Sequence, residues 1–99
     1  MLVHLPFQPD WRAAVVSGAK TSTVRTRRFG SAGDAFELEG ARFTLLAVDA
    51  MVLDAARDTL WREEGMASPQ EFERVWIQNH PTRGYRGADQ VWAHRFAKA

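Results

Sequence analysis

The sequence contains no cysteine, which excludes a disulfide framework, a thiolate metal site and a cysteine nucleophile. Only three histidines are present, His4, His80 and His94, and their wide separation disfavours a histidine-based metal site. No apolar run approaches the roughly 20 residues that a membrane-spanning helix needs, so we expect no membrane association. The N-terminal residues lack the charged and apolar regions of a signal peptide, and we therefore expect a cytoplasmic protein.

A large excess of one charge is also absent, because 13 Lys and Arg against 12 Asp and Glu leave a net charge of +1. If the protein binds RNA, its positive charge must be concentrated locally. Hydrophobic residues make up 45% of the 99 residues and include four Trp and six Phe, so disorder is not expected. This supply suits one hydrophobic core, and we expect residues 1–99 to form a single domain.

The spacing of apolar residues changes along the chain and predicts an α+β fold. We expect a small mixed sheet that curls into a barrel and is flanked by helices. The expected elements are a strand at 2–5, a helix opened by Pro9 and ended by Gly18, a strand within 20–25, a hairpin of strands 35–38 and 42–52, helices at about 54–64 and 69–80, and a closing strand at 89–98.

Several local signals fix the ends of these elements. Asp54 is expected to cap the helix 54–64, and Ser68-Pro69-Gln70-Glu71 is a capping box for the next helix. That helix must end near His80, because Pro81 disfavours a helical conformation in the residue before it. Glu39-Gly40 is expected to turn the hairpin, and the pair Leu45-Leu46 suggests a segment buried on both sides.

The chain also carries four short motifs in a recognisable order. Gly18-Ala19-Lys20-Thr21-Ser22-Thr23-Val24-Arg25 resembles the G-x-K-T-x-T-x-R motif of the ASCH family. Gly33-Asp34 resembles the family's Gly-Asp turn, and Glu64-Gly65-Met66 with Ser68 and Glu71-Phe72 resembles its acidic helix end and following helix. Val91-Trp92-Ala93-His94-Arg95-Phe96 resembles its closing strand, so the resemblance spans Gly18 to Phe96.

This resemblance implies a PUA-like barrel with a cleft between barrel and helices that receives RNA or a modified nucleoside. In length and layout the chain also resembles a bacterial branch that hydrolyses N4-acetylcytidine to cytidine and acetate. The residues that carry this activity correspond to Lys20, Thr23 and Glu64. Other ASCH proteins are associated with ribonuclease activity, so the family alone does not determine one reaction.

The three residues have chemistry that suits acyl transfer without a metal or another cofactor. A threonine hydroxyl such as that of Thr23 becomes a nucleophile only when a nearby base removes its proton. Lys20 could be that base if burial lowers its pKa, and Glu64 could activate water or hold Lys20 in place. Helical phase alone does not separate Glu64 from Glu63; the resemblance selects Glu64.

Binding residues are expected around this motif and in one later loop. Arg25, Arg27 and Arg28 concentrate positive charge and could bind phosphates, although a solvated loop is equally consistent with Arg27 and Arg28. Tyr85 and Arg86 lie in the loop before the closing strand, where an exposed tyrosine could stack on a base. We interpret Trp61, Trp76 and Trp92 as core residues first, and His94 as a structural histidine.

Two classes of function therefore follow from the sequence. The first is a module that binds RNA or a nucleoside in a basic cleft, and the second is a small hydrolase, most specifically an N4-acetylcytidine amidohydrolase. The combination of Lys20, Thr23 and Glu64 favours an active site, whereas the additional arginines favour a longer anionic ligand than a free nucleoside. No feature specifically supports a third class, a protein-interaction domain.

Overall fold

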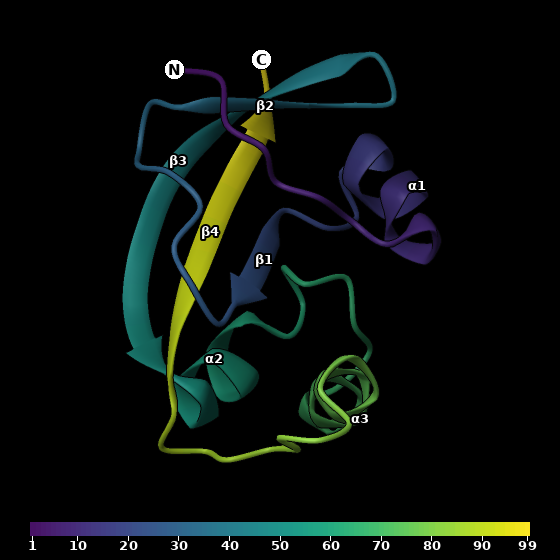
Figure 1. Ribbon diagram of the computed structural model, residues 1–99. Helices are drawn as coiled ribbons and strands as arrows, with labels where there is room; N and C mark the ends of the chain where they lie inside the picture. The colour runs from purple at the N-terminus through teal and green to yellow at the C-terminus, as the bar shows by residue number, and fades with distance from the viewer.

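The computed structural model describes residues 1–99 and shows one curved sheet with three helices (Figure 1). The elements follow in the order α1 (Pro9–Ser17), β1 (Ser22–Arg25), β2 (Ala35–Leu38), β3 (Ala41–Val52), α2 (Leu53–Leu60), α3 (Pro69–Asn79) and β4 (Gln90–Lys98). The strands lie in the order β1-β4-β3-β2 and are all antiparallel. The predicted α+β fold is confirmed, and the sheet forms a half-barrel whose only parallel pairing is the isolated bridge between Leu2 and Ala35.

Strand β3 forms a hairpin with β2 and contains a bulge where it pairs with β4. The hairpin turn lies at Glu39 and Gly40, as predicted, and both residues have a positive φ, 52° and 77°. Positive φ at both positions matches the twist of the flanking strands. A bulge between Leu45 and Ala47 bends β3, so Leu45 is 1% exposed while Leu46 is 60% exposed. The expected burial of Leu46 is therefore wrong, because the bulge turns this side chain outward.

Two hydrophobic clusters lie on opposite faces of the sheet, since alternate residues of β4 contribute to each. An aromatic cluster joins the N-terminal segment and α1 to the sheet, and its members are Leu5, Phe7, Val15, Phe36, Phe43, Leu45 and Phe96. A second cluster joins α2 and α3 to the other face, and its members are Val24, Leu53, Ala56, Leu60, Phe72, Trp76, Val91 and Ala93. Strand β1 therefore lies where the two helical layers approach each other (Figure 1).

Helices α1 and α3 begin and end as their sequences predict. Gly18 follows α1 with a φ of 87°, and its N–H donates to the Val15 carbonyl. At the start of α3 the Ser68 hydroxyl accepts a hydrogen bond of 3.0 Å from the Glu71 N–H. The Glu71 carboxylate accepts from the Ala67 N–H instead of from the capping residue itself. Helix α3 ends at Asn79, immediately before His80 and Pro81.

Two sequence predictions about the ends of elements are wrong. Residues 2–5 form no strand, because the segment leaves the sheet after the Leu2 bridge and reaches Pro6. Helix α2 begins at Leu53, so Asp54 lies in its first turn rather than at its cap. The Asp54 carboxylate instead accepts a hydrogen bond of 2.8 Å from the Tyr85 hydroxyl. No helix is both long enough and apolar enough to span a membrane.

Helix α2 is also shorter than predicted, and this difference matters for the site. It ends at Leu60 rather than at residue 64, and residues 61–65 form turns. Gly65 has a φ of 81°, a conformation that strongly favours glycine. These turns carry Glu64 away from the helix axis and toward β1.

Candidate active site

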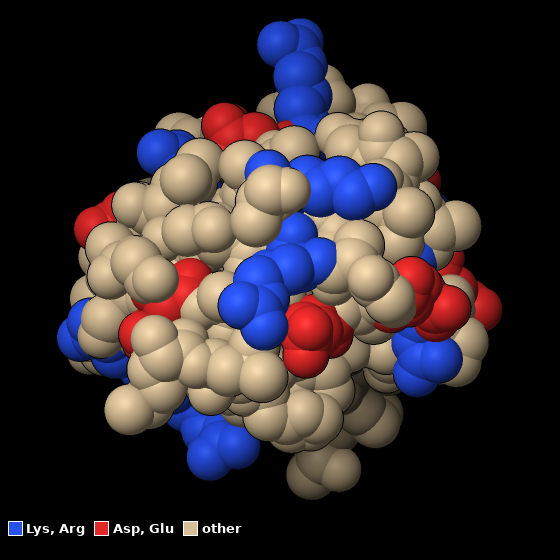
Figure 2. All heavy atoms as spheres, turned by 90° about the horizontal axis from the view of Figure 1, so that it is seen from above, with Lys and Arg blue, Asp and Glu red and all other residues tan.

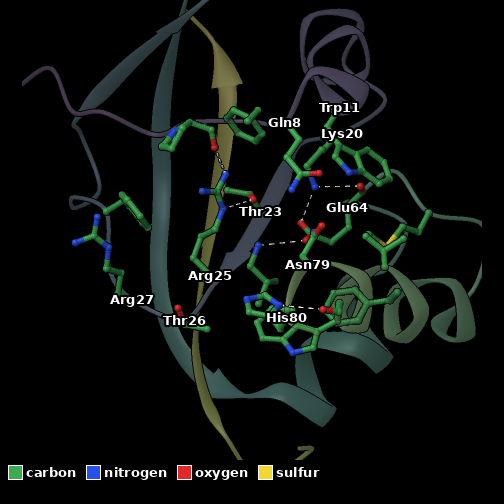
Figure 3. Close-up of a pocket in the computed structure, with 18 residues that line it drawn as sticks. Gln8, Trp11, Lys20, Thr23, Arg25, Thr26, Arg27, Glu64, Asn79 and His80 are labelled. Carbon is green, nitrogen blue, oxygen red and sulfur yellow. Dashed lines mark hydrogen bonds and ion pairs between the residues drawn. The ribbon is translucent and has the colours of Figure 1, made fainter. Parts of the chain in front are cut away.

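A cavity of about 300 Å³ opens between β1, α3 and the segment that leads into α1 (Figure 3). All three motif residues singled out from the sequence, Lys20, Thr23 and Glu64, line it. The rest of the wall comes from the segment 6–11, from β1 and the loop after it, from Met66 and from α3 with its C-terminal end. The first motif and the acidic residue of the third, which lie about 40 residues apart in the sequence, therefore meet at this cavity.

The backbone brings Lys20 and Glu64 together. The Glu63 carbonyl accepts hydrogen bonds from the N–H groups of Thr21 and Ser22, at 2.7 and 3.1 Å, and so fastens the turn after α2 to the start of β1. The Lys20 ammonium lies 3.4 Å from Glu64 Oε2 and donates to the Glu64 backbone carbonyl at 3.2 Å. Both side chains are 5% exposed, so this is a buried ion pair.

Burial changes the proton affinity of both partners. It lowers the pKa of Lys20 and raises the pKa of Glu64, although the opposite charge of each partner acts against the shift. The Val24 N–H donates to Glu64 Oε1 at 3.2 Å and also favours the ionised carboxylate. Glu64 Oε2 makes no hydrogen bond of good geometry, so the Lys20 contact is mainly electrostatic. The uncharged form of the pair is therefore easier to reach than it would be in water.

Thr23 and Arg25 lie on the same face of β1, as the alternation of the strand predicts. Arg25 Nε donates a hydrogen bond of 2.9 Å to Thr23 Oγ1, and its Nη2 donates to the Pro6 carbonyl. Because the Thr23 oxygen accepts from a guanidinium, its own hydrogen is free to be donated to a base. Burial lowers the pKa of Arg25, which nevertheless stays a cation at neutral pH.

His94 holds the backbone behind Thr23. Its Nε2 lies 3.0 Å from the Phe29 N–H, which can only donate, so Nε2 must be the unprotonated nitrogen. Nδ1 therefore carries the hydrogen and donates to the Thr23 carbonyl at 3.1 Å. Burial lowers the pKa of His94, which favours this neutral form. His94 thus has the two satisfied nitrogens of a structural histidine.

Aromatic side chains form much of the cavity wall. Trp76 stacks on His80 with ring centroids 4.1 Å apart, and Phe72 also stacks on Trp76. Arg27 lies over the Phe29 ring at 4.4 Å. In the close-up, Arg27 and His80 are drawn on opposite sides of Arg25 (Figure 3). Trp76 is therefore a core residue, as expected, that also lines the cavity.

The remaining predicted binding residues do not reach the cavity. Arg28 donates to the Gly30 carbonyl and the Ser31 hydroxyl, and it lies over the Trp92 ring. Tyr85 is held by Asp54 in the loop before β4, where burial and that carboxylate raise its pKa. Neither Tyr85 nor Arg86 lines the cavity, so the structure does not bring them together with the motif residues.

Sequence reasoning missed the residues that complete the cavity from outside the motif. Gln8 and Trp11 come from the start of α1, and Asn79 and His80 come from the end of α3 (Figure 3). Phe72, Trp76 and Asn79 follow one another at helical spacing, but a sequence does not show that such a stripe extends from the core into a cavity. No group of three or more His, Asp or Glu side chains is placed to hold a metal ion.

The surface charge agrees with the modest net charge of the sequence. Seen from the end that carries both termini, basic side chains run across the middle of the face and acidic ones flank them (Figure 2). No broad surface of one sign forms in this view. At the cavity the basic residues are Lys20, Arg25 and Arg27, and Glu64 offsets the charge of Lys20.

No protein-family model matches the sequence, and no curated protein matches it. Solved structures do resemble it. An ASCH domain from Lactobacillus crispatus JV V101 superposes with a TM-score of 0.70 at 10% identity, over 98% of this chain and 77% of the other. Protein EF3133 from Enterococcus faecalis V583 gives 0.65 at 18% identity, over 91% and 70%. The hypothetical protein PH0355 gives 0.69 at 16% identity, over 94% of each chain. At these identities the likeness concerns the fold, and the chain has the ASCH-domain fold that its motifs predict.

Proposed function

We propose that the protein binds a modified nucleoside in this cavity and hydrolyses an acyl group from an exocyclic amine of the base, with N4-acetylcytidine as the substrate. The observation that carries the proposal is the buried ion pair of Lys20 and Glu64 in the same small cavity as the Thr23 hydroxyl. The sequence resemblance to the acetylcytidine-hydrolysing branch supports the choice of substrate.

The size and walls of the cavity support a single nucleoside. Its volume of about 300 Å³ lies at the lower end of the range of small-molecule pockets. The stacked rings of Trp76 and His80 offer the flat aromatic surface on which a base packs. A polymer could extend past the rim, but only one base at a time would reach Lys20 and Glu64.

The reaction is an acyl transfer in two steps. Neutral Lys20 accepts the hydroxyl proton as Thr23 Oγ1 forms a bond to the acetyl carbon. The bond from that carbon to N4 then breaks, Lys20 returns the proton to N4, and cytidine leaves. In the second step the Glu64 carboxylate takes a proton from water as the water oxygen bonds to the acetyl carbon. The bond from that carbon to Thr23 Oγ1 then breaks, Glu64 returns its proton to Oγ1, and acetic acid leaves and ionises to acetate in solvent. The cationic Arg25 beside Thr23 Oγ1 lowers the cost of negative charge on that oxygen.

The test is to incubate the purified protein with N4-acetylcytidine and to measure cytidine by chromatography. Lys20→Ala, Thr23→Val and Glu64→Ala should each reduce kcat by about 10²-fold or more, as the loss of acid–base or nucleophilic groups does. Thr44→Val, on β3 and away from the cavity, is the matched control for the threonine change. Absence of turnover by the folded wild-type protein would refute the proposal.

RNA binding without turnover is a second candidate, and the exposed Arg27 at the cavity rim favours it. If Arg27 and Arg28 contact phosphates, their replacement by alanine should weaken RNA binding and flatten its dependence on salt. The slope of log K against log salt should change by about 0.7 for each lost contact with a single strand. An unchanged slope would exclude both arginines as phosphate ligands.

A further inference from the structure

Strand β1 has one edge that pairs with no other strand. Thr23 and Arg25 lie opposite His94 and Trp92 of β4, and the Phe96 N–H donates to the Thr21 carbonyl. In an antiparallel pair, alternate residues direct their backbone groups at the partner. Residues 21, 23 and 25 therefore bond to β4, and the backbone groups of residues 22, 24 and 26 point the other way.

The first part of this free edge is already occupied. The Ser22 N–H donates to the Glu63 carbonyl, and the Val24 N–H donates to Glu64 Oε1. Further along the edge come the Val24 carbonyl and the Thr26 N–H, and both residues line the cavity. The protein supplies no hydrogen-bond partner to the Thr26 N–H, and no loop N–H donates to the Val24 carbonyl.

An open strand edge normally invites another strand, but this one lies in a cavity of about 300 Å³. That space suits a planar ring and not a folded partner. We propose that this edge reads the base: the Val24 carbonyl accepts a hydrogen bond from an N–H of the ligand, and the Thr26 N–H donates to a ring nitrogen or carbonyl oxygen. The inference rests on the proposed function and names the backbone groups that bind and orient its substrate.

The arrangement specifies the hydrogen-bonding pattern of the ligand. The ligand must present a donor and an acceptor on the same edge, as an N4-acylated cytosine does through its N4–H and its N3 or O2. A uracil can meet the same pattern with its N3–H and a carbonyl oxygen, but it then presents a carbonyl instead of an acylated amine to the Lys20–Glu64 pair. Because Glu64 binds the N–H of Val24, a base held here has its amine substituent near the Lys20–Glu64 pair.

Substitution at Thr26 tests the donor. Thr26→Pro removes the N–H, and it suits the chain because Arg25, the preceding residue, lies in a strand as proline requires. Thr26→Ala removes the side chain and keeps the N–H. We expect a KM for N4-acetylcytidine about 10-fold higher in the proline variant than in the alanine variant, the usual effect of one hydrogen bond. Equal KM values in two folded variants would overturn the inference.

Amide resonances give a second measurement that needs neither turnover nor a folded proline variant. In the Thr23→Ala protein, N4-acetylcytidine should move the Thr26 amide proton downfield and saturably. Saturable shifts elsewhere in the cavity with an unmoved Thr26 amide would overturn the inference. If cytidine shifts the Thr26 amide resonance but the wild-type protein releases no acetate from N4-acetylcytidine, the hydrolase proposal is refuted and the proposed hydrogen bonds to the base are supported.

Discussion

Replacement of Glu64 by glutamine isolates the cost of the buried charge of Lys20. The two side chains are 5% exposed and their charged atoms lie 3.4 Å apart. Glutamine keeps an oxygen for the Val24 N–H but leaves the ammonium without a counter-ion. Removal of one partner of a buried pair costs about 3–5 kcal/mol. Lys20 can avoid that cost by losing its proton. For a lysine with the ordinary pKa of 10.5, deprotonation at pH 7 costs about 5 kcal/mol, which sets an upper limit on the loss of stability.

The same reasoning fixes how the loss depends on pH. The free energy of deprotonating Lys20 falls by about 1.4 kcal/mol for each unit by which the pH rises. The upper limit on the loss of stability is therefore about 2 kcal/mol at pH 9. Glu64→Gln should therefore lose roughly 3–5 kcal/mol of stability at pH 7 and no more than about 2 kcal/mol at pH 9. The double variant Lys20→Met with Glu64→Gln contains no unpaired charge and should lie within about 1 kcal/mol of the wild type.

Urea unfolding at the two pH values measures these free energies, with tryptophan fluorescence as the signal. An unchanged m-value would show that the variants unfold from equally compact states. At pH 7 the single variant should also melt roughly 10 °C lower or more, since about 1 kcal/mol shifts Tm by roughly 4–8 °C in a domain of this size. A loss below about 1 kcal/mol at pH 7, or an equal loss at pH 9, would refute the reasoning.

Three further predictions concern the scaffold. Burial lowers the pKa of His94 from 6.5, so the unfolded chain binds more protons than the folded one and stability should fall as the pH drops below about 6.5. Tm values at pH 7 and pH 5 measure this loss, which should be smaller in His94→Gln. Gly30→Ala should cost about 1–3 kcal/mol in urea unfolding, because φ is 101° and a Cβ would lie 3.1 Å from Asp34 Oδ2 and Val3 Cγ1. Ser68→Ala should cost about 1 kcal/mol in the same assay, because it removes the cap of α3.

Local signals predict most of the fold. The hairpin at Glu39-Gly40, the stop at Gly18 and the cap at Ser68 each follow from chemistry within a few residues, and all three are confirmed. The failures have non-local causes. Asp54 carries the sequence signature of a cap, but a hydrogen bond from Tyr85, 31 residues away, occupies its carboxylate. The bulge that exposes Leu46 depends on pairing with β4, which no local pattern reports.

In the candidate site, too, local patterns predict some features and tertiary contacts determine the others. Alternation along β1 predicts that Thr23 and Arg25 share a face, and their hydrogen bond confirms it. Helical phase could not choose between Glu63 and Glu64, because the helix ends before either residue. The choice is made by the turn after α2, which directs Glu64 to Lys20 and leaves Glu63 to pair with Arg95 at the surface. Such a turn is decided by tertiary contacts.

The environment of Lys20 differs from the one expected of a lysine that only favours the end of a helix. As the second residue after Gly18, a lysine could simply interact with the C-terminal dipole of α1. Its ammonium instead contacts the carboxylate and the carbonyl of Glu64, 44 residues away, and is buried. A well-packed apolar pair at these positions would often be as stable or more stable than the ion pair. Since small domains have little stability to spare, a buried pair in the same cavity as the Thr23 hydroxyl agrees with the catalytic role that we propose for it.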